Sequence, residues 1–194
     1  MLVSVASIST RAPKEFDKEQ TKAKIPHLIT KLAELQSVMY AEKKHSLLII
    51  LQGMDASGKD GVVKEVFTGV NPMGCKVQSF KKPTEEELAH DFLWRIHKHT
   101  PAPGMIQLFN PSHYEDILIT RVHQWIDDSV AKQRMKAINA FEELLESQNT
   151  HILKFYLHIS REEQLERLNE RITNPYKRYK YQAADLEESK HWDR

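Results

Sequence analysis

The main pattern along the chain is an alternation of short apolar runs with longer segments in which apolar residues recur every three or four positions. The apolar runs predict four strands, at residues 46–52, 75–80, 105–109 and 151–159. The other segments predict amphipathic helices, at about 17–42, 62–69, 84–100, 112–122, 128–147 and from 160 onward. Strands that alternate with helices predict a parallel sheet with right-handed crossovers, and therefore an α/β fold.

The predicted elements fill the chain without a clear boundary, so we expect a single domain over residues 1–194. Residues 1–16 lack a stable period and are expected to form an irregular arm. Pro26 lies inside the first helical pattern and is expected to mark the start of its main part. Asn71 begins a predicted turn, and Ser160 with Glu163 forms a capping-box pattern that predicts a helix start.

The turn after the first predicted strand carries the clearest chemistry. The sequence LLIILQGMDASGKDG contains Gly53, Gly58 and Lys59 at the G-x-x-x-x-G-K spacing of a phosphate-binding loop. Glycines let backbone N–H groups turn toward phosphate oxygens, a helix N-terminus favours anions, and Lys59 adds a cation. Asp60 stands where Ser or Thr usually serves magnesium, so Asp55 and Asp60 are candidate carboxylate ligands. The alternative is an ordinary strand, turn and helix.

Polar residues also follow two other predicted strands. Lys81 and Lys82 follow the second strand, and residues 110–115 follow the third. Because ligands bind where the carboxyl ends of parallel strands meet, we expect these residues to gather beside the phosphate loop. A solvated strand end for the lysines, and a turn with a helix cap for residues 110–115, are the alternatives.

Basic and aromatic residues gather near the end of the chain. Pro175 precedes their densest part, in which Lys177, Arg178 and Lys180 alternate with tyrosines. A basic segment after the fourth strand is where nucleotide kinases place a lid, so we expect a lid over about 167–184. A nucleic-acid-binding surface or a solvated face would have the same composition.

Composition indicates the cellular environment of the protein but does not indicate its function. The 194 residues include 28 Lys and Arg against 27 Asp and Glu, so net charge does not select a polyanionic partner. The only cysteine, Cys75, excludes an internal disulfide and suits the cytoplasm, and we expect it to be a small apolar residue. No segment approaches the roughly 20 apolar residues of a membrane span, and the first ten residues lack the features of a signal peptide.

Several separate blocks, in order, resemble the polyphosphate kinase 2 family of polyphosphate:nucleotide phosphotransferases. The similarity runs from about Leu32 to the last residue. The blocks are QGMDASGKDG (52–61), NPMG (71–74), SFKKPT (79–84), HDFLWR (90–95), LFNPSHYEDIL (108–118), INAFE (138–142), ILKFYLHIS (152–160) and DLEESKHWD (185–193). The resemblance implies a P-loop kinase fold, in which a three-layer α/β/α sandwich with a parallel sheet carries a helical lid.

The resemblance also implies an activity. Family members transfer a phosphoryl group between inorganic polyphosphate and a nucleoside diphosphate such as ADP or GDP, or a monophosphate such as AMP or GMP. The reaction depends on Mg²⁺, with Mn²⁺ as an alternative ion, and the relatives tend to form dimers or tetramers. Neither a nucleic acid nor a membrane is an expected partner, and the near-neutral charge also disfavours nucleic acid.

Site residues follow from the resemblance by position. Asp55 would bind the metal or orient the acceptor phosphate, Lys59 would hold the transferring phosphoryl group, and Arg121 would complete the catalytic set. Asn110 and Glu115 resemble members that accept both mono- and diphosphates. The remaining loop residues expected to bind phosphate or nucleotide are Gly53, Met54, Ala56, Ser57, Gly58, Asp60 and Gly61. The expected basic contacts are Lys81 and Arg95, with Lys177, Arg178 and Lys180 as a lid that clamps polyphosphate.

The chain departs from the family pattern at three places. Pro111 stands where arginine is usual, so one phosphate contact is expected to be missing. The segment between His123 and Ile138 is shorter than usual, and members continue past the position of Trp192 whereas this chain ends at Arg194. We therefore expect a final part of the family fold to be missing. The open alternatives are an ATP-dependent nucleoside monophosphate kinase and a non-catalytic relative that binds polyphosphate or nucleotide.

Overall fold

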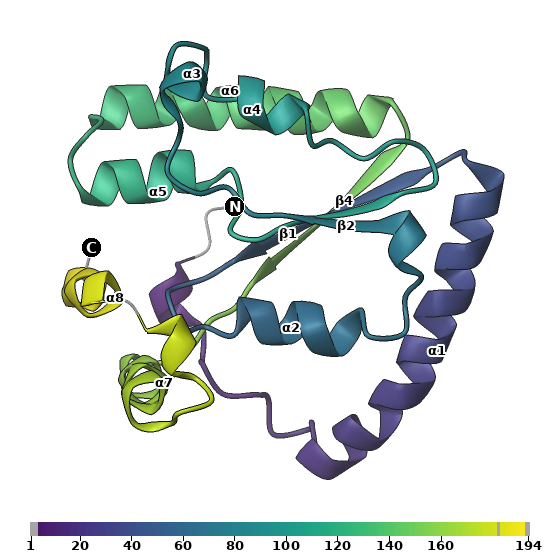
Figure 1. The fold of residues 1–194 in the computed structure, drawn as a ribbon, viewed down its shortest axis with the longest axis horizontal. Helices are drawn as coiled ribbons and strands as arrows, with labels where there is room; N and C mark the ends of the chain where they lie inside the picture. Colours follow the sequence, from purple (N-terminus) through teal and green to yellow (C-terminus); the bar gives the residue numbers. More distant parts are fainter. Residues whose placement is uncertain (1–3, 182, 193–194) are drawn as a thin grey trace. The chain divides into compact units, whose positions relative to one another are not determined.

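Four parallel strands form the sheet of the computed structural model, which describes residues 4–181 and 183–192 (Figure 1). They are β1 (Ser46–Gln52), β2 (Cys75–Gln78), β3 (Ile106–Phe109) and β4 (Thr150–Tyr156). Their order across the sheet is β2-β3-β1-β4, and Ile49 of β1 lies opposite both Leu108 and Leu153. The predicted strands and the α/β fold class are confirmed, with β2 and β4 ending earlier than expected.

Two units are defined by contacts within the chain. One comprises Ile29–Gln52 and Lys59–Tyr156, and it contains the sheet. The other comprises Met1–Leu28, Gly53–Gly58 and Leu157–Arg194, so it contains the predicted phosphate loop, residues 53–58. The expected single domain with an arm and a lid stays a prediction.

Helices cover both faces of the sheet within the first unit. They are α2 (Lys59–Val66), α3 (Glu85–Leu88), α4 (Trp94–His97), α5 (Glu115–Val122) and α6 (Asp128–Ser147), together with the second part of α1 (Lys18–Glu42). Figure 1 shows α1 and α2 on one side of the strands and α3 to α6 on the other. The sheet unit therefore has the three layers that were expected.

The core divides into two clusters because successive side chains of a strand point to opposite faces. Leu48 and Ile50 of β1 belong to one cluster, which includes residues of α4, α5 and α6. Ile49 and Leu51 belong to the other, whose partly buried members include residues of α1 and α2. β1 is thus buried on both sides, as its continuous apolar sequence predicts.

One expected helix is wrong. The chain over residues 84–100 forms the short helices α3 and α4 instead of a continuous helix. Asp91 starts a new turn between them, because its carboxylate accepts from the Leu93 N–H at 3.0 Å and its carbonyl accepts from the Trp94 N–H. A side chain that bonds to nearby backbone in this way competes with the helical ladder.

The second unit is mainly helical. It contains the first part of α1, α7 (Arg161–Thr173), α8 (Ala183–Glu188) and single 3₁₀ turns at Val5–Ser7, Arg178–Lys180 and Ser189–His191. Ser160 caps α7 by accepting from the Glu163 N–H at 3.2 Å, which confirms the predicted helix start. The expectation for Pro26 is wrong, because α1 begins at Lys18 and continues through the proline.

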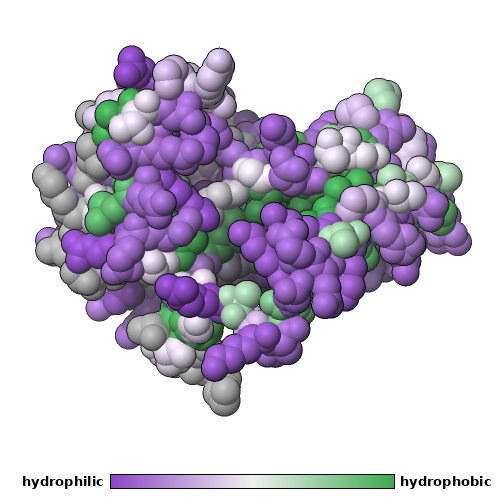
Figure 2. Space-filling model, turned by 90° about the horizontal axis from the view of Figure 1, so that it is seen from below, coloured by the Kyte–Doolittle hydropathy of each residue, from purple (hydrophilic) through white to green (hydrophobic). Residues whose placement is uncertain are grey.

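The described helices were compared with the length and apolar character that a membrane span requires. None of the helices in residues 4–181 and 183–192 is long and apolar enough to cross a bilayer. On the face drawn in Figure 2, hydrophilic residues predominate and hydrophobic residues form smaller patches.

Candidate phosphate-binding site

The phosphate loop joins the end of β1 to the first turn of α2. Gly53 has a φ of 155° and Gly58 a φ of 102°, which L side chains rarely adopt. A Cβ atom on Gly53 would also lie 2.9 Å from the Leu157 carbonyl oxygen. Both glycines of the motif are therefore required by the backbone conformation, and the predicted strand, loop and helix are confirmed as elements.

Helix α7 contacts the loop through Gln164, which the sequence analysis did not select, and Arg167, which it placed at the start of the expected lid. Gln164 Nε2 donates to the Asp55 carbonyl at 3.0 Å. Arg167 Nη1 donates to the carbonyls of Ala56 at 3.1 Å and Ser57 at 2.9 Å. The capping-box pattern predicted helix α7, but the helix sequence did not indicate that these two side chains bond backbone carbonyls of the loop.

Lys59 and Asp60 begin α2 in the sheet unit. Lys59 is half-buried, and Asp60 Oδ1 accepts from Asn110 Nδ2 at 3.0 Å. Asn110 is itself buried after β3, and its N–H donates to the Gln78 carbonyl at the end of β2. The predicted meeting of strand ends is therefore observed for Asp60 and Asn110.

Gln52, the last residue of β1, connects two residues of the segment after β3. Ser112 Oγ donates to Gln52 Oε1, and Gln52 Nε2 donates to Glu115 Oε1, both at 2.7 Å. This places Glu115 beside the end of β1, as expected for a site residue. The Asn110–Pro111 peptide in the same segment is cis.

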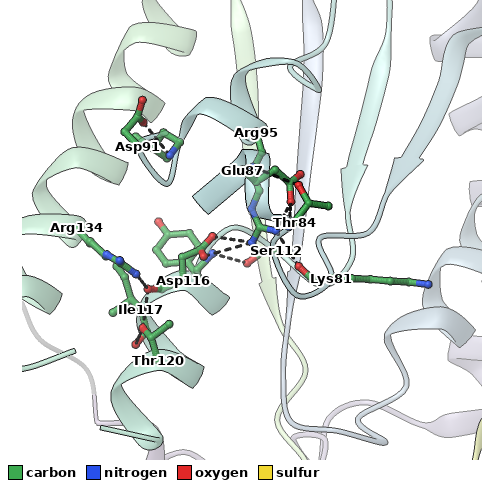
Figure 3. A network of polar contacts seen from close by, with 12 residues as sticks. Lys81, Thr84, Glu87, Asp91, Arg95, Ser112, Asp116, Ile117, Thr120 and Arg134 are labelled. Atoms are coloured by element: carbon green, nitrogen blue, oxygen red, sulfur yellow. Dashed lines mark hydrogen bonds and ion pairs between the residues drawn. The ribbon is translucent and has the colours of Figure 1, made fainter. Parts of the chain in front are cut away.

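Arg95 lies at the centre of a network drawn in Figure 3. Its Nη2 donates to both carboxylate oxygens of Asp116, at 3.3 and 3.1 Å, and its Nη1 donates to the Lys81 carbonyl at 2.7 Å. Glu87 Oε2 lies 3.6 Å from the same nitrogen. Arg95 is 7% exposed, so a phosphate contact by its guanidinium would require these pairs to open.

The other predicted basic contacts are exposed except Lys180, which is half-buried. Figure 3 shows the Lys81 side chain extending away from the network, while its carbonyl faces Arg95. Arg121 Nε pairs with Asp128 Oδ1 at 2.8 Å on the surface. In the predicted lid, Lys177 pairs with Glu170 of α7 at 2.6 Å, Lys180 lies 5.9 Å from the ring centre of Tyr179, and Arg178 is exposed.

Comparison with known proteins identifies the family. The family model described as polyphosphate kinase 2 matches residues 15–194. The chain belongs to the polyphosphate kinase 2 family. This confirms the resemblance read from the sequence blocks.

Relatives in the polyphosphate kinase 2 family are similar over most of the chain. An AMP/ADP-polyphosphate phosphotransferase from Meiothermus ruber is 46% identical over 191 residues, covering 93% of this chain and 72% of that protein. An ADP-polyphosphate phosphotransferase from Rhodopseudomonas palustris is 45% identical, covering 85% of this chain and 61% of that protein. The crystal structure of polyphosphate kinase 2 from Arthrobacter aurescens TC1 matches with a TM-score of 0.94 at 43% identity. That match covers 98% of this chain and 70% of the solved one.

Proposed function

We propose that this chain transfers a phosphoryl group between inorganic polyphosphate and a nucleoside mono- or diphosphate. The observation that supports this most directly is the phosphate loop followed by Lys59, in a chain that the polyphosphate kinase 2 family model matches over residues 15–194. In the forward direction an oxygen of the nucleotide's terminal phosphate attacks the end phosphorus of polyphosphate. The bond to the penultimate phosphate breaks, so polyphosphate becomes one unit shorter as the nucleotide becomes one unit longer.

Phosphoryl transfer depends mainly on positioning and charge neutralisation, which this loop is suited to supply. Lys59 would hold the transferring phosphoryl group, with the N-terminus of α2 favouring the same anion. Ser57 Oγ is buried and forms no hydrogen bond within the described residues, so it is a donor that a phosphate oxygen could use. Arg121 and Lys81, both exposed, would contact further phosphates.

Mg²⁺, or Mn²⁺ in its place, is part of the proposal. The described residues contain no group of three or more His, Cys, Asp or Glu side chains suited to a metal. Asp55 has an exposed carboxylate on the loop, and Mg²⁺ typically uses one or two carboxylates with substrate phosphates and water. Asp55 would therefore hold the ion, which would neutralise phosphate charge during transfer.

The acceptor is proposed to be a mono- or a diphosphate, with ADP, GDP, AMP and GMP as candidates. Asn110 and Glu115 support both kinds of acceptor, because they resemble family members that accept mono- and diphosphates. Asn110 bonds Asp60 at the start of α2, and Glu115 bonds Gln52 at the end of β1. The name of the Meiothermus ruber relative includes both AMP and ADP. Lys177, Arg178 and Lys180 are proposed to clamp polyphosphate, and a cytoplasmic location and a homo-oligomeric state complete the proposal.

The direct test measures ATP formation from ADP, polyphosphate and Mg²⁺, with AMP as a parallel acceptor. We expect Lys59→Ala to lower turnover by at least about 100-fold without unfolding the chain, because one preorganised charge contact is worth this much. Lys64→Ala, an exposed change one turn further along α2, is the matched control and should retain activity.

The outcome separates the open alternatives. Activity with ATP and a monophosphate, but none with polyphosphate, would show an ATP-dependent nucleoside monophosphate kinase. Tight binding of polyphosphate without any transfer would show a non-catalytic relative. Full activity in Lys59→Ala would refute the assignment of the loop.

A further inference from the structure

Helix α7 holds three successive carbonyl groups of the phosphate loop. Gln164 binds the carbonyl of Asp55, and Arg167 binds those of Ala56 and Ser57. Gln164 is 1% exposed, and Arg167 is fixed further by its Nε, which pairs with Glu163 Oε1 at 2.6 Å. The loop and α7 belong to the same unit of the chain.

These contacts also determine where the N–H groups of the loop point. A trans peptide is planar, so the N–H of each residue points opposite to the carbonyl of the residue before it. Carbonyls turned toward α7 at Asp55 and Ser57 therefore direct the N–H groups of Ala56 and Gly58 to the opposite side. The intervening Ser57 N–H is used within the loop, where it donates to the Met54 carbonyl at 3.0 Å.

The loop would not be expected to keep this conformation without support. Ala56 has a φ of 61°, and a non-glycine residue in this region is held there by its surroundings at some cost in free energy. Gly58 fits the same arrangement, because a Cβ atom on it would lie 3.2 Å from Arg167 Nη1. The positive φ of Ala56 and the missing Cβ of Gly58 both suit the position of the Arg167 guanidinium.

We propose that Gln164 and Arg167 are positioning residues of the phosphate loop. They hold the carbonyls of Asp55, Ala56 and Ser57 so that the N–H groups of Ala56 and Gly58 face the bound phosphates. The inference rests on the proposed function, because it takes the loop as the phosphate site. It adds residues of α7 that act through the backbone and do not contact the substrate.

A direct phosphate contact by Arg167 is the alternative. Its Nη1 and Nε are both committed to protein oxygens, which disfavours that role. The two roles also differ in what they affect. A loop held in shape serves every ligand that binds it, whereas a direct charge contact serves only the phosphate it touches.

The test compares Arg167→Lys and Gln164→Leu with the wild type. Lysine keeps the charge but lacks the planar guanidinium, in which Nε pairs with Glu163 while Nη1 bonds both carbonyls, and leucine lacks the donor. We expect each change to lower kcat by about 10- to 100-fold, the cost of a small misplacement, and to weaken binding of ADP and tripolyphosphate alike. Arg161→Lys, at the exposed first position of α7, is the matched control and should leave all three values unchanged.

Hydrogen exchange of the amides at residues 54–58, without ligand, provides a readout independent of activity. The proposal is supported if the amides exchange faster in both variants and at the wild-type rate in the control. It also requires that the double variant exchange no faster than the more severe single variant. Loss of polyphosphate affinity alone, with ADP binding and exchange unchanged, would overturn it in favour of direct contact. A wild-type chain without transfer would refute the proposed function, and the exchange rates would still decide whether α7 holds the loop.

Discussion

Arg95 and Asp116 form a buried ion pair at 3.1 Å. Both side chains are nearly inaccessible, at 8% and 11%, and the Arg95 guanidinium also binds the Lys81 carbonyl (Figure 3). The Asp116 backbone is held as well, since its carbonyl accepts from Arg134 Nη1 at 2.5 Å. The pair thus connects the loop after β2 with the start of α5.

Breaking this pair should destabilise the fold strongly. Asp116→Ala leaves the buried Arg95 charge with only the longer contact to Glu87 at 3.6 Å, so we expect the free energy of unfolding to fall by about 3 kcal/mol. Asp128→Ala breaks the exposed pair with Arg121 and should cost only about 0–1 kcal/mol. Urea unfolding at neutral pH measures both, and equal losses would contradict a structural role for Arg95.

Individual site residues could be predicted from the sequence where their role depends on neighbouring positions in the chain. The spacing of Gly53, Gly58 and Lys59 predicted the loop, and its backbone conformation depends on the two glycines. The phosphate contact expected of Arg95 stays a prediction, but the sequence did not reveal that its charge is buried and paired with Asp116. The loop contacts of Arg167 were missed for a related reason, since its acceptors are backbone carbonyls of residues more than 100 positions away.

The contact between β4 and α6 depends on charged side chains. Lys154 of β4 pairs with Glu142 of α6, and the Tyr114 hydroxyl donates to Glu142 Oε1 at 2.9 Å. Burial would raise the pKa of Glu142, but contacts with His113, Lys154 and Tyr114 outweigh it and hold the pKa below its ordinary value. Burial likewise opposes the charge of Lys154, yet its bonds to Glu142 and Tyr114 raise its pKa.

These shifts predict an acid-sensitive contact between the two elements. A lowered pKa at Glu142 means that its contribution is present above the ordinary value of 4.5 and is lost as the pH falls through the folded value. Glu142→Gln should lose about 1.5–3 kcal/mol at pH 7, the range for hydrogen bonds to charged groups. We expect this deficit to shrink as the pH falls below about 4.5, measured by urea unfolding across that range. A deficit that stays constant with pH would show that the carboxylate charge is unimportant.

Elements were predicted well where the apolar pattern is strong, as in the continuous apolar run of β1 and the helical period of α6, which both contribute residues to the core. The break between α3 and α4 was missed because the apolar residues continue across it. It is caused by the side chain of Asp91, which competes for backbone donors. Periodicity reports which residues are buried and says little about such a local competition.

For the whole molecule, the parallel topology explains why distant blocks of sequence contribute to one edge. Within the sheet unit, Lys81 and Asn110 follow the carboxyl ends of β2 and β3, and Asp60, which lies beyond β1 in the chain, accepts from Asn110 at 3.0 Å. The general rule for parallel sheets predicted that edge, whereas the strand order β2-β3-β1-β4 had no signal in the sequence. The division of contacts into two units was not predicted either, because no change in composition marks it.

A ligand that binds this loop should raise the unfolding temperature of the chain. Binding to the folded state alone at 100 times the dissociation constant stabilises it by about 2.7 kcal/mol. For a chain of 194 residues this corresponds to a rise of about 5–10 °C. Tripolyphosphate with Mg²⁺, and separately ADP with Mg²⁺, are the probes, followed by thermal unfolding at fixed protein concentration.

The variants make this measurement specific to the loop. Lys59→Ala should remove most of the rise for both ligands, whereas Lys64→Ala should keep it, because only Lys59 belongs to the phosphate motif. Sodium chloride at the same ionic strength controls for general effects of salt on stability, because sulfate would itself bind a phosphate site. A rise that persists unchanged in Lys59→Ala would place the anion elsewhere on the protein, and the assignment of the loop would then be wrong.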